Sequence, residues 1–223
     1  MTTSSRRSPL LDVPDGSAEP VVHAWTPIEP EALLARLGIA THTPAVLAVD
    51  GRSGAGKSTL AAQLAAVVPD AAVLATDDVA WHHSMFGWAR DLIDHVVTPF
   101  RRGSAVHYRP PGWVAKGRSG ALSIPPNRSL LIIEGVGSSQ RAMTAALDAS
   151  VWVQSDAPTA RVRGIERDVA SGVNGDRTAS IAFWDAWMNE ELPFLEQDAP
   201  WSRAAVFVAG VRPDGTEGLL VSF

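Results

Sequence analysis

The sequence predicts an α/β fold in which a doubly wound parallel sheet of about five strands carries helices on both faces. Short apolar runs alternate with helical stretches along most of the 223 residues, and this alternation is typical of parallel sheets with helical crossovers. In addition, a glycine-rich turn, GRSGAGKST, joins the first strong strand to a helix. Such a turn at a strand–helix junction favours this fold class over a bundle or a sandwich.

Each expected element has a local sequence signal. The strands are short apolar runs bounded by turn-forming residues, at residues 45–49, 71–75, 130–133, 150–154 and 204–209. Helices are expected where apolar residues recur at helical spacing or helix boundary signals occur, at residues 31–37, 57–68, 86–100, 140–147, 158–169 and 180–195. The Gly- and Pro-rich residues 101–127 are expected to form a long connection, and connections of that length usually serve a function or move.

Composition limits the domain organisation and the partners. Residues 1–28 have few apolar clusters and are expected to form a flexible tail, followed by a single domain at residues 29–223. The net charge of -5 gives no general attraction to nucleic acid or to an anionic membrane. With no cysteine, disulfides and thiolate sites are excluded. No signal peptide and no apolar run of about 18 residues is seen, so we expect a cytoplasmic protein.

The glycine-rich turn at residues 51–59 satisfies the P-loop pattern G-x-x-x-x-G-K-[ST]. Its backbone N–H groups and the positive end of the next helix would hold the phosphates of ATP. Lys57 is one of only two lysines among 19 basic residues, and it would reach the β- and γ-phosphates while Ser58 binds Mg²⁺. The residues expected to contact the nucleotide are Gly51, Ser53, Gly54, Ala55, Gly56, Lys57, Ser58 and Thr59.

Carboxylates follow two of the expected strands. Asp77 and Asp78 come directly after residues 71–75, and Glu134 ends the run LLIIE. Because the carboxyl ends of parallel strands open onto one crevice, these side chains should face the P-loop. Asp77 is expected to accept a proton from the hydroxyl that attacks the γ-phosphorus. Glu134 and Asp78 are expected to help hold Mg²⁺, although Asp78 could instead cap a helix or bind substrate.

Three arginines lie on the helix expected at residues 158–169: Arg161, Arg163 and Arg167. Arg163 and Arg167 are four residues apart and therefore share a face. We expect these two to close over the triphosphate as a lid and to offset charge in the transition state. The adjacent Asp168 could hold the arginine geometry.

With these motifs in place, the chain resembles the uridine kinase and pantothenate kinase branch of P-loop kinases from about residue 45 to residue 209. The resemblance rests on GRSGAGKST, on TDD at residues 76–78, on LLIIEGVG at residues 130–137 and on RVRGIERD at residues 161–168. It implies an ATP- and Mg²⁺-dependent phosphotransferase acting on a hydroxyl of a small metabolite. It also implies Asp77 as the base and a nucleoside similar to uridine or cytidine as the leading acceptor.

The acceptor region departs from the pattern of the uridine kinase family. Where that family has tyrosine, aspartate and phenylalanine, then histidine and arginine, this chain reads PGWVAKGR, so Lys116 takes the histidine's place and Arg118 is retained. Two alternatives remain open: this region forms a different pocket, for an anionic or sugar-like acceptor, or it packs on the edge of the sheet. The residues expected to meet the acceptor are Asp77, Trp81, His82, Tyr108, Arg109, Trp113, Lys116 and Arg118.

Two other functions are alternatives to a small-molecule kinase: an ATPase or nucleotide switch, and a kinase-like binding module, each acting with a protein partner. Neither the N-K-x-D guanine motif nor the L-S-G-G-Q segment of transporter ATPases occurs in the sequence. The carboxylate after the second strand and the arginine helix favour phosphoryl transfer to a bound acceptor.

Overall fold

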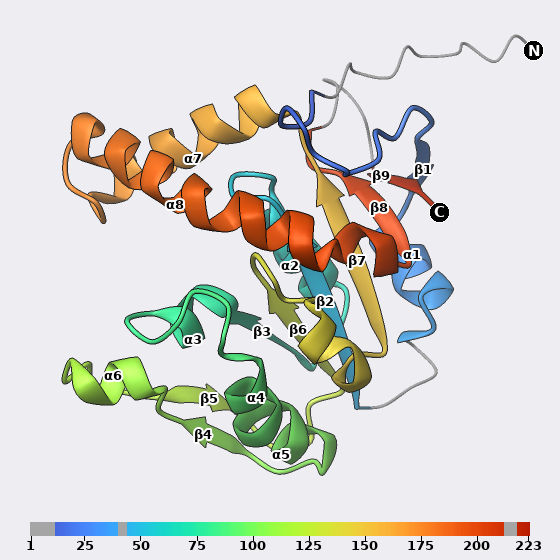
Figure 1. Ribbon diagram of the computed structural model, residues 1–223. Coiled ribbons are helices and arrows are strands. Elements are labelled where there is room, and N and C mark those ends of the chain that lie inside the picture. The colour runs from blue at the N-terminus through green and yellow to red at the C-terminus, as the bar shows by residue number, and fades with distance from the viewer. Residues whose placement is uncertain (1–11, 40–43, 212–217) are drawn as a thin grey trace, which may run out of the picture.

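The computed structural model describes residues 12–39, 44–211 and 218–223, and its centre is a twisted sheet with helices on both faces (Figure 1). Within these residues the sheet has seven strands in the order β1-β9-β8-β7-β2-β6-β3. The parallel strands are β3 (Ala71–Ala75), β6 (Leu130–Glu134), β2 (Ala45–Gly51), β7 (Ala149–Gln154) and β8 (Val206–Ala209). The expected doubly wound parallel sheet is therefore confirmed.

The sheet is extended by two antiparallel strands that the sequence did not predict. β9 (Leu219–Ser222) pairs with β8, and β1 (Thr26–Ile28) pairs with β9. Both strands are short, and they extend the sheet beyond β8, the last strand of its parallel part.

The order of the strands fixes where a ligand can bind. β2 lies between β6 and β7. The next two strands of this sheet along the chain, β3 and β6, lie on one side of β2, and the later strands β7 and β8 lie on the other, so the direction of strand order reverses at β2. Open α/β sheets bind ligands at such a reversal, outside the carboxyl ends of the strands. Val49 pairs in register with Glu134, and Gly51 pairs with Val153, so the end of β2 lies level with its neighbours.

The two faces of the sheet have separate cores because side chains alternate along each strand. Leu47 and Val49 of β2 pack with α1 (Pro30–Arg36) and α2 (Lys57–Ala66). Val46 faces the other way, toward the cluster formed by α3 (Thr76–Ala80), α4 (Ala89–Leu92), η2 (Ile93–Val97), α5 (Thr98–Arg101) and the 3₁₀ helix η3 (Arg141–Ala146). The same face also carries a smaller cluster of Trp152, Leu195 and Trp201 beneath α8 (Arg177–Asp198) and η4 (Pro200–Arg203).

The helix expected at residues 86–100 is a continuous run of α4, η2 and α5, with a π-helical middle. Pro99 explains the change in hydrogen bonding, because it has no N–H to donate to the carbonyl four residues earlier. Trp88, Leu92 and Val96 are fully buried, as their spacing indicates, whereas His95 is exposed.

The connection at residues 101–127 contains regular structure that the sequence did not predict. β4 (Val106–Tyr108) and β5 (Leu122–Ile124) form a two-stranded antiparallel sheet around α6 (Pro111–Ala115). Val106 and Ile124 are buried in the core beneath α4 and η2, which explains why so short a pair of strands is stable here.

The structure describes part of the segment at residues 1–28, which was expected to form a flexible tail. Residues 12–28 lie against the domain: Glu19 is buried, Ala157 N–H donates to the carbonyl of Asp12, and β1 joins the sheet. Polar contacts hold this segment, so its lack of apolar clusters gave no sign of order. Residues 1–11 lie outside the described residues.

α7 (Ala157–Ser171) and α8 are the two long helices after β7, and they lie side by side near the carboxyl edge of the sheet (Figure 1). α7 begins where the Asp156 side chain accepts from Thr159 N–H, and it ends at Gly172, whose φ is +67°. Among the helices of the described segments, none is long and apolar enough to cross a membrane.

Candidate nucleotide-binding site

The turn at residues 51–59 is folded between β2 and α2, and its shape requires glycine. Gly54 has φ +74°, and a Cβ there would lie 2.0 Å from the carbonyl oxygen of Ala160 in α7. Gly56 has φ +102° and caps the N-terminus of α2, which begins at Lys57. The positive φ values and the contact with α7 exclude larger residues at these two positions, and the first turn of α2 points its free N–H groups toward the loop.

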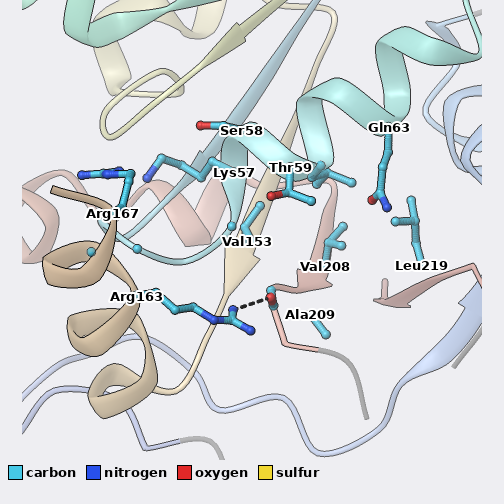
Figure 2. Close-up of a pocket in the computed structure, with 15 residues that line it drawn as sticks. Lys57, Ser58, Thr59, Gln63, Val153, Arg163, Arg167, Val208, Ala209 and Leu219 are labelled. Atoms are coloured by element: carbon cyan, nitrogen blue, oxygen red, sulfur yellow. Dashed lines mark hydrogen bonds between the residues drawn. The ribbon is translucent and has the colours of Figure 1, made fainter. Parts of the chain in front are cut away.

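Lys57 is buried at the start of α2, and its Nζ donates to the carbonyl oxygen of Arg52 at 2.9 Å. It lines a cavity of about 500 Å³ together with Gly54, Gly56, Ser58 and Thr59 (Figure 2). The cavity continues along α2 to Gln63 and along the ends of β7 and β8. The arrangement offers backbone N–H groups, one ammonium group and hydroxyl groups to an anion.

Ser58 and Glu134 form the candidate cation site. Ser58 Oγ donates to Glu134 Oε1 at 3.0 Å, which joins the start of α2 to the end of β6. Burial raises the pKa of Glu134, the charge of Lys57 and the Ser58 hydrogen bond oppose the rise, and the nearby charge of Asp77 adds to it. A hydroxyl and a carboxylate fit Mg²⁺, which takes few protein ligands and completes its shell with phosphate oxygens and water.

Asp50 lies beneath the P-loop and was not predicted to take part in the site. It is fully buried, and its carboxylate accepts from Gly51 N–H, Gly137 N–H, and both the N–H and the hydroxyl of Ser139. Burial raises the pKa of Asp50, while the Ser139 and Gly51 hydrogen bonds and the charge of Lys57 act against the rise. Asp50 thereby links the end of β2 to the loop that follows Glu134.

The arginines of α7 form the opposite wall of the cavity. Arg163 and Arg167 both line it, and Arg163 Nη1 donates to the carbonyl oxygen of Gly210 at 3.0 Å (Figure 2). Arg167 pairs with the buried carboxylate of Asp168, with Nη2 and Oδ1 2.8 Å apart. Arg161 points elsewhere and pairs with Asp185 of α8. The structure thus brings Arg163 and Arg167, and not Arg161, to the cavity beside the P-loop.

The two aspartates after β3 have different surroundings. Asp77 is exposed at the start of α3, and its charge reaches Glu134. Asp78 Oδ1 accepts from Arg118 Nη2 at 3.0 Å, so its observed partner is one of the residues expected to meet the acceptor. The Arg118 guanidinium also lies 3.6 Å from the ring centroid of Trp113.

The other predicted acceptor residues divide into packed and exposed groups. Trp113 is buried in the core, with its Nε1 donating to the carbonyl of Asp78, and Tyr108 stacks on His95. Burial, reinforced by the charge of Asp91, raises the pKa of Tyr108 to about 12. Arg109 Nη2 donates to the carbonyl of Arg118, and Lys116 is exposed.

Trp81 and His82 form the exposed turn after α3. Their rings meet edge to face with centroids 4.5 Å apart, and His82 has a φ of +51°, which is unusual for a residue other than glycine. α6 approaches this turn so closely that a Cβ on Gly112 would lie 1.9 Å from the Trp81 carbonyl oxygen. A residue other than glycine that is held in this backbone conformation is a candidate for a functional position.

Not every predicted nucleotide contact lines the cavity. Of the eight P-loop residues expected there, Gly54, Gly56, Lys57, Ser58 and Thr59 line it, whereas Gly51, Ser53 and Ala55 do not. Gly51 packs against Val153 and Ala55 is fully buried, while Ser53 is held by α8. Sequence reasoning also missed Gly210, where a Cβ would lie 1.8 Å from the Ala55 carbonyl oxygen.

Comparisons with known proteins support the fold and leave the family open. No protein-family model matches the chain, and no curated protein matches it either. Among solved structures, a possible uridine kinase from Bacillus stearothermophilus is 17% identical with a TM-score of 0.48, covering 79% of this chain and 98% of its own. A candidate fructose transport system kinase from Silicibacter sp. TM1040 is 20% identical with a TM-score of 0.49, covering 78% and 93%.

The structure of the YGR205w protein is 12% identical with a TM-score of 0.50, covering 80% of this chain and 89% of that one. At these identities a likeness shows the fold alone. This likeness agrees with the expected α/β fold and its largely parallel sheet, in which the P-loop turn lies between β2 and α2.

Proposed function

We propose that this chain is an ATP-dependent phosphotransferase that moves the γ-phosphate to a hydroxyl group of a small metabolite. One observation carries the proposal. Lys57 and Ser58 from the P-loop and Arg163 and Arg167 from α7 line the same cavity of about 500 Å³. A cavity with cationic groups on two opposite walls, and backbone N–H groups between them, suits a triphosphate.

The roles of the residues follow from their positions. The loop N–H groups and Lys57 bind the β- and γ-phosphates, and Arg163 and Arg167 approach from the other side. Ser58 and Glu134 would hold Mg²⁺, which would supply positive charge against the phosphate oxygens. Arg163 must then exchange the Gly210 carbonyl for phosphate oxygens, a change that a rotation of one long side chain provides.

Asp77 is the proposed base. It is exposed at the end of β3, and its charge reaches Glu134, so it faces the space between the phosphates and the acceptor residues. There it accepts the proton of the acceptor hydroxyl as that oxygen bonds to the γ-phosphorus and ADP leaves. Asp78, tied to Arg118, belongs with the acceptor-binding group.

The acceptor proposed first is a nucleoside similar to uridine or cytidine, which rests on the sequence resemblance. Arg118 is held between Asp78 and Trp113 and is the retained residue of that pattern. The replaced positions at Pro111, Gly112 and Lys116 mean that sugars and pantothenate-like alcohols belong in the same assay.

The test is ADP release from ATP·Mg²⁺ with a panel of nucleosides, sugars and pantothenate-like alcohols. Acceptor-dependent ADP release supports the proposal, whereas slow hydrolysis that ignores every acceptor but responds to a protein supports the nucleotide switch. Asp77→Asn is expected to keep ATP binding and lose about a hundredfold or more in turnover. Asp78→Asn is the matched control and should mainly raise the acceptor KM. Near-normal turnover of Asp77→Asn would remove it from the role of base.

A further inference from the structure

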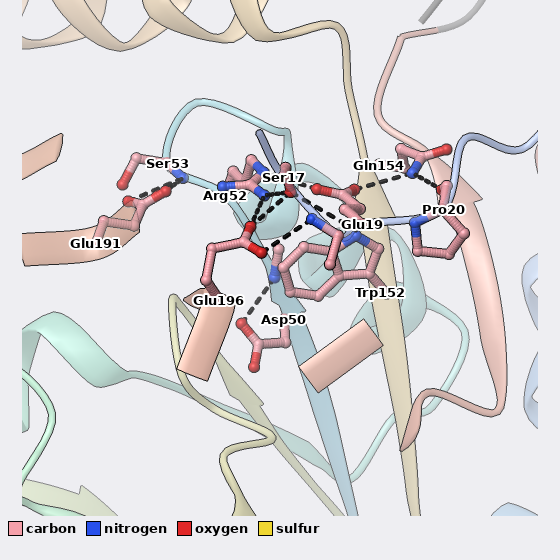
Figure 3. Close-up of polar contacts among 12 residues, drawn as sticks. Ser17, Glu19, Pro20, Asp50, Arg52, Ser53, Trp152, Gln154, Glu191 and Glu196 are labelled. Atoms are coloured by element: carbon pink, nitrogen blue, oxygen red, sulfur yellow. Dashed lines mark hydrogen bonds and ion pairs between the residues drawn. The ribbon is translucent and has the colours of Figure 1, made fainter. Parts of the chain in front are cut away.

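Two consecutive residues of the P-loop are held by buried carboxylates from outside the loop. The first is Arg52, which is buried although it lies in a turn between Gly51 and Gly54. Its Nε donates to Glu19 Oε2 at 2.7 Å, and its Nη2 donates to Ser17 Oγ at 2.8 Å (Figure 3). Glu19 Oε1 in turn accepts from Trp152 Nε1 and from Gln154 Nε2, so the Glu19 carboxylate ties the N-terminal segment to β7 and to the loop.

The second is Ser53, which is held from α8. Glu191 is fully buried, and its two carboxylate oxygens lie 3.1 and 3.3 Å from Ser53 N. Trp187 Nε1 donates to Glu191 and also to Ser53 Oγ at 2.7 Å. Within the described residues no ion pair involves Glu191, so a charge buried here is offset chiefly by donors of the P-loop and of Trp187.

These contacts lie outside the phosphate cavity. None of Glu19, Arg52, Ser53 and Glu191 lines it, so the carboxylates do not occupy the place of a phosphate. Arg52 is nevertheless linked to the cavity by a single hydrogen bond, because Lys57 lines the cavity and its Nζ donates to the carbonyl oxygen of Arg52. A shift of Arg52 or Ser53 would therefore move both the lysine and the following N–H groups.

α8 also connects this arrangement to the arginine helix. Glu196 accepts from Ser17 Oγ at 2.6 Å and from Ala18 N–H at 2.9 Å, so α8 holds the N-terminal segment as well as Ser53. On the other side α8 packs on α7, where a Cβ on Gly164 would lie 1.9 Å from Trp184. α7 carries both arginines of the cavity wall, so the loop and that wall share one rigid support.

We propose that Glu19 and Glu191 are positioning residues that form a clamp on Arg52 and Ser53, setting the P-loop in its phosphate-binding shape. This rests on the proposed function, since the shape matters through nucleotide binding. The clamp consists of Glu19 from the N-terminal segment and Glu191 from α8. It makes the order of residues 17–20 a condition for tight nucleotide binding.

The test compares Glu19→Gln and Glu191→Gln with Asp148→Asn. Asp148 is a matched control because it also holds an arginine and a backbone N–H, those of Arg101 and Val46, at the other end of β2. Amide hydrogen exchange of residues 51–59 is measured without nucleotide, and the Kd of a non-hydrolysable ATP analogue with Mg²⁺ is measured by calorimetry. All are measured well below each variant's Tm.

Both clamp variants should exchange residues 51–59 faster than the wild type and bind the analogue about tenfold more weakly, a common effect of losing a group that orients a ligand-binding residue. Asp148→Asn should lower Tm yet leave both readouts unchanged. The clamp is refuted if its variants change exchange and Kd no more than the control does. If a clamp variant does not fold, Ser17→Ala and Trp187→Phe, which each remove one supporting donor, are judged by the same criterion.

The two readouts separate the clamp from the proposed function. A wild-type protein that does not bind the analogue would refute the kinase proposal, while hydrogen exchange would still show whether Glu19 and Glu191 hold the loop. A wild type that binds, with variants whose loop exchange and affinity are unaltered, would refute the clamp alone.

Discussion

Replacing Asp50 by asparagine tests whether an ionised carboxylate anchors the P-loop to the neighbouring strand. Asp50 is fully buried and accepts four hydrogen bonds, two on each oxygen. Oδ1 accepts from Gly51 N–H at 2.8 Å and Gly137 N–H at 2.9 Å, and Oδ2 accepts from Ser139 N–H at 2.8 Å and Ser139 Oγ at 2.7 Å. Asparagine keeps the shape but turns one oxygen into a donor.

The expected cost follows from this geometry. In either orientation the new NH₂ group faces a backbone N–H, so at least one of these N–H groups loses its acceptor, while the Ser139 hydroxyl can turn to accept from an NH₂ group placed beside it. A hydrogen bond to a charged group contributes about 1.5–3 kcal/mol, and a buried donor left without a partner costs a similar amount. Burial raises the pKa of Asp50, so a neutral side chain recovers part of this loss. We expect the free energy of unfolding to fall by about 2–4 kcal/mol.

The assay is urea denaturation at pH 7, with the wild type and Ser139→Ala measured alongside. Ser139→Ala removes only the hydroxyl donor and should cost about 1 kcal/mol. An Asp50→Asn protein as stable as the wild type, or more stable than Ser139→Ala, would show that the carboxylate is not held as an ionised acceptor.

The remaining predictions concern the cavity and its support. Lys57→Ala should abolish measurable binding of the ATP analogue in calorimetry while the far-UV circular dichroism stays native, and retained affinity would contradict the phosphate role of Lys57. Gly164→Ala should lower the free energy of unfolding measured in urea by about 1–3 kcal/mol, because its Cβ would lie 1.9 Å from Trp184 and α7 must move away from α8. An unchanged midpoint would mean that these helices separate freely. Burial raises the pKa of Glu134 above 4.5, so the folded state holds this proton more tightly than the unfolded state does. In nucleotide-free protein, stability relative to Glu134→Gln should therefore fall as pH rises through the raised pKa, and a rise instead would show that the site favours the ionised form.

The parallel part of the sheet could be predicted because its strands are rich in apolar residues, and in β2 and β6 nearly every residue is buried. β2, β3, β6, β7 and β8 read as short apolar runs, and their predicted bounds differ from the observed ones by at most two residues. β1 and β9 could not be predicted in this way. They are short strands of three and four residues, and their formation depends on the pairing of β9 with β8 and of β1 with β9.

The candidate site was predictable where its chemistry is local in sequence. Residues 54–59 form a motif in which glycine positions, lysine and serine have fixed spacing, and the structure places most of it around one cavity. Glu19 could not be inferred, because a single glutamate in a polar segment carries no sign of the partners it meets across the fold.

Glu191 did have a sequence signal. Trp184, Trp187, Glu191 and Leu195 recur at spacings of three or four residues, which places the glutamate on the inward face of its helix. Leu195 and Glu191 are indeed fully buried. A carboxylate at an apolar position of a helix must find donors in the interior. In the structure Glu191 finds them in Ser53 N–H of the P-loop and in Trp187 Nε1.

If the proposed function holds, the buried carboxylates give one physical reason why the P-loop is ready before a nucleotide binds. A run of N–H groups and a helix N-terminus concentrate positive potential at the loop. Glu19 and Glu191 take donors on the outside of the turn, and Asp50 takes the N–H of Gly51 at its root. The groups facing the cavity are thereby left fixed in direction. When donors are already in place, less free energy is lost to ordering them as phosphate binds. We therefore expect these carboxylates, which do not contact the ligand, to influence its affinity.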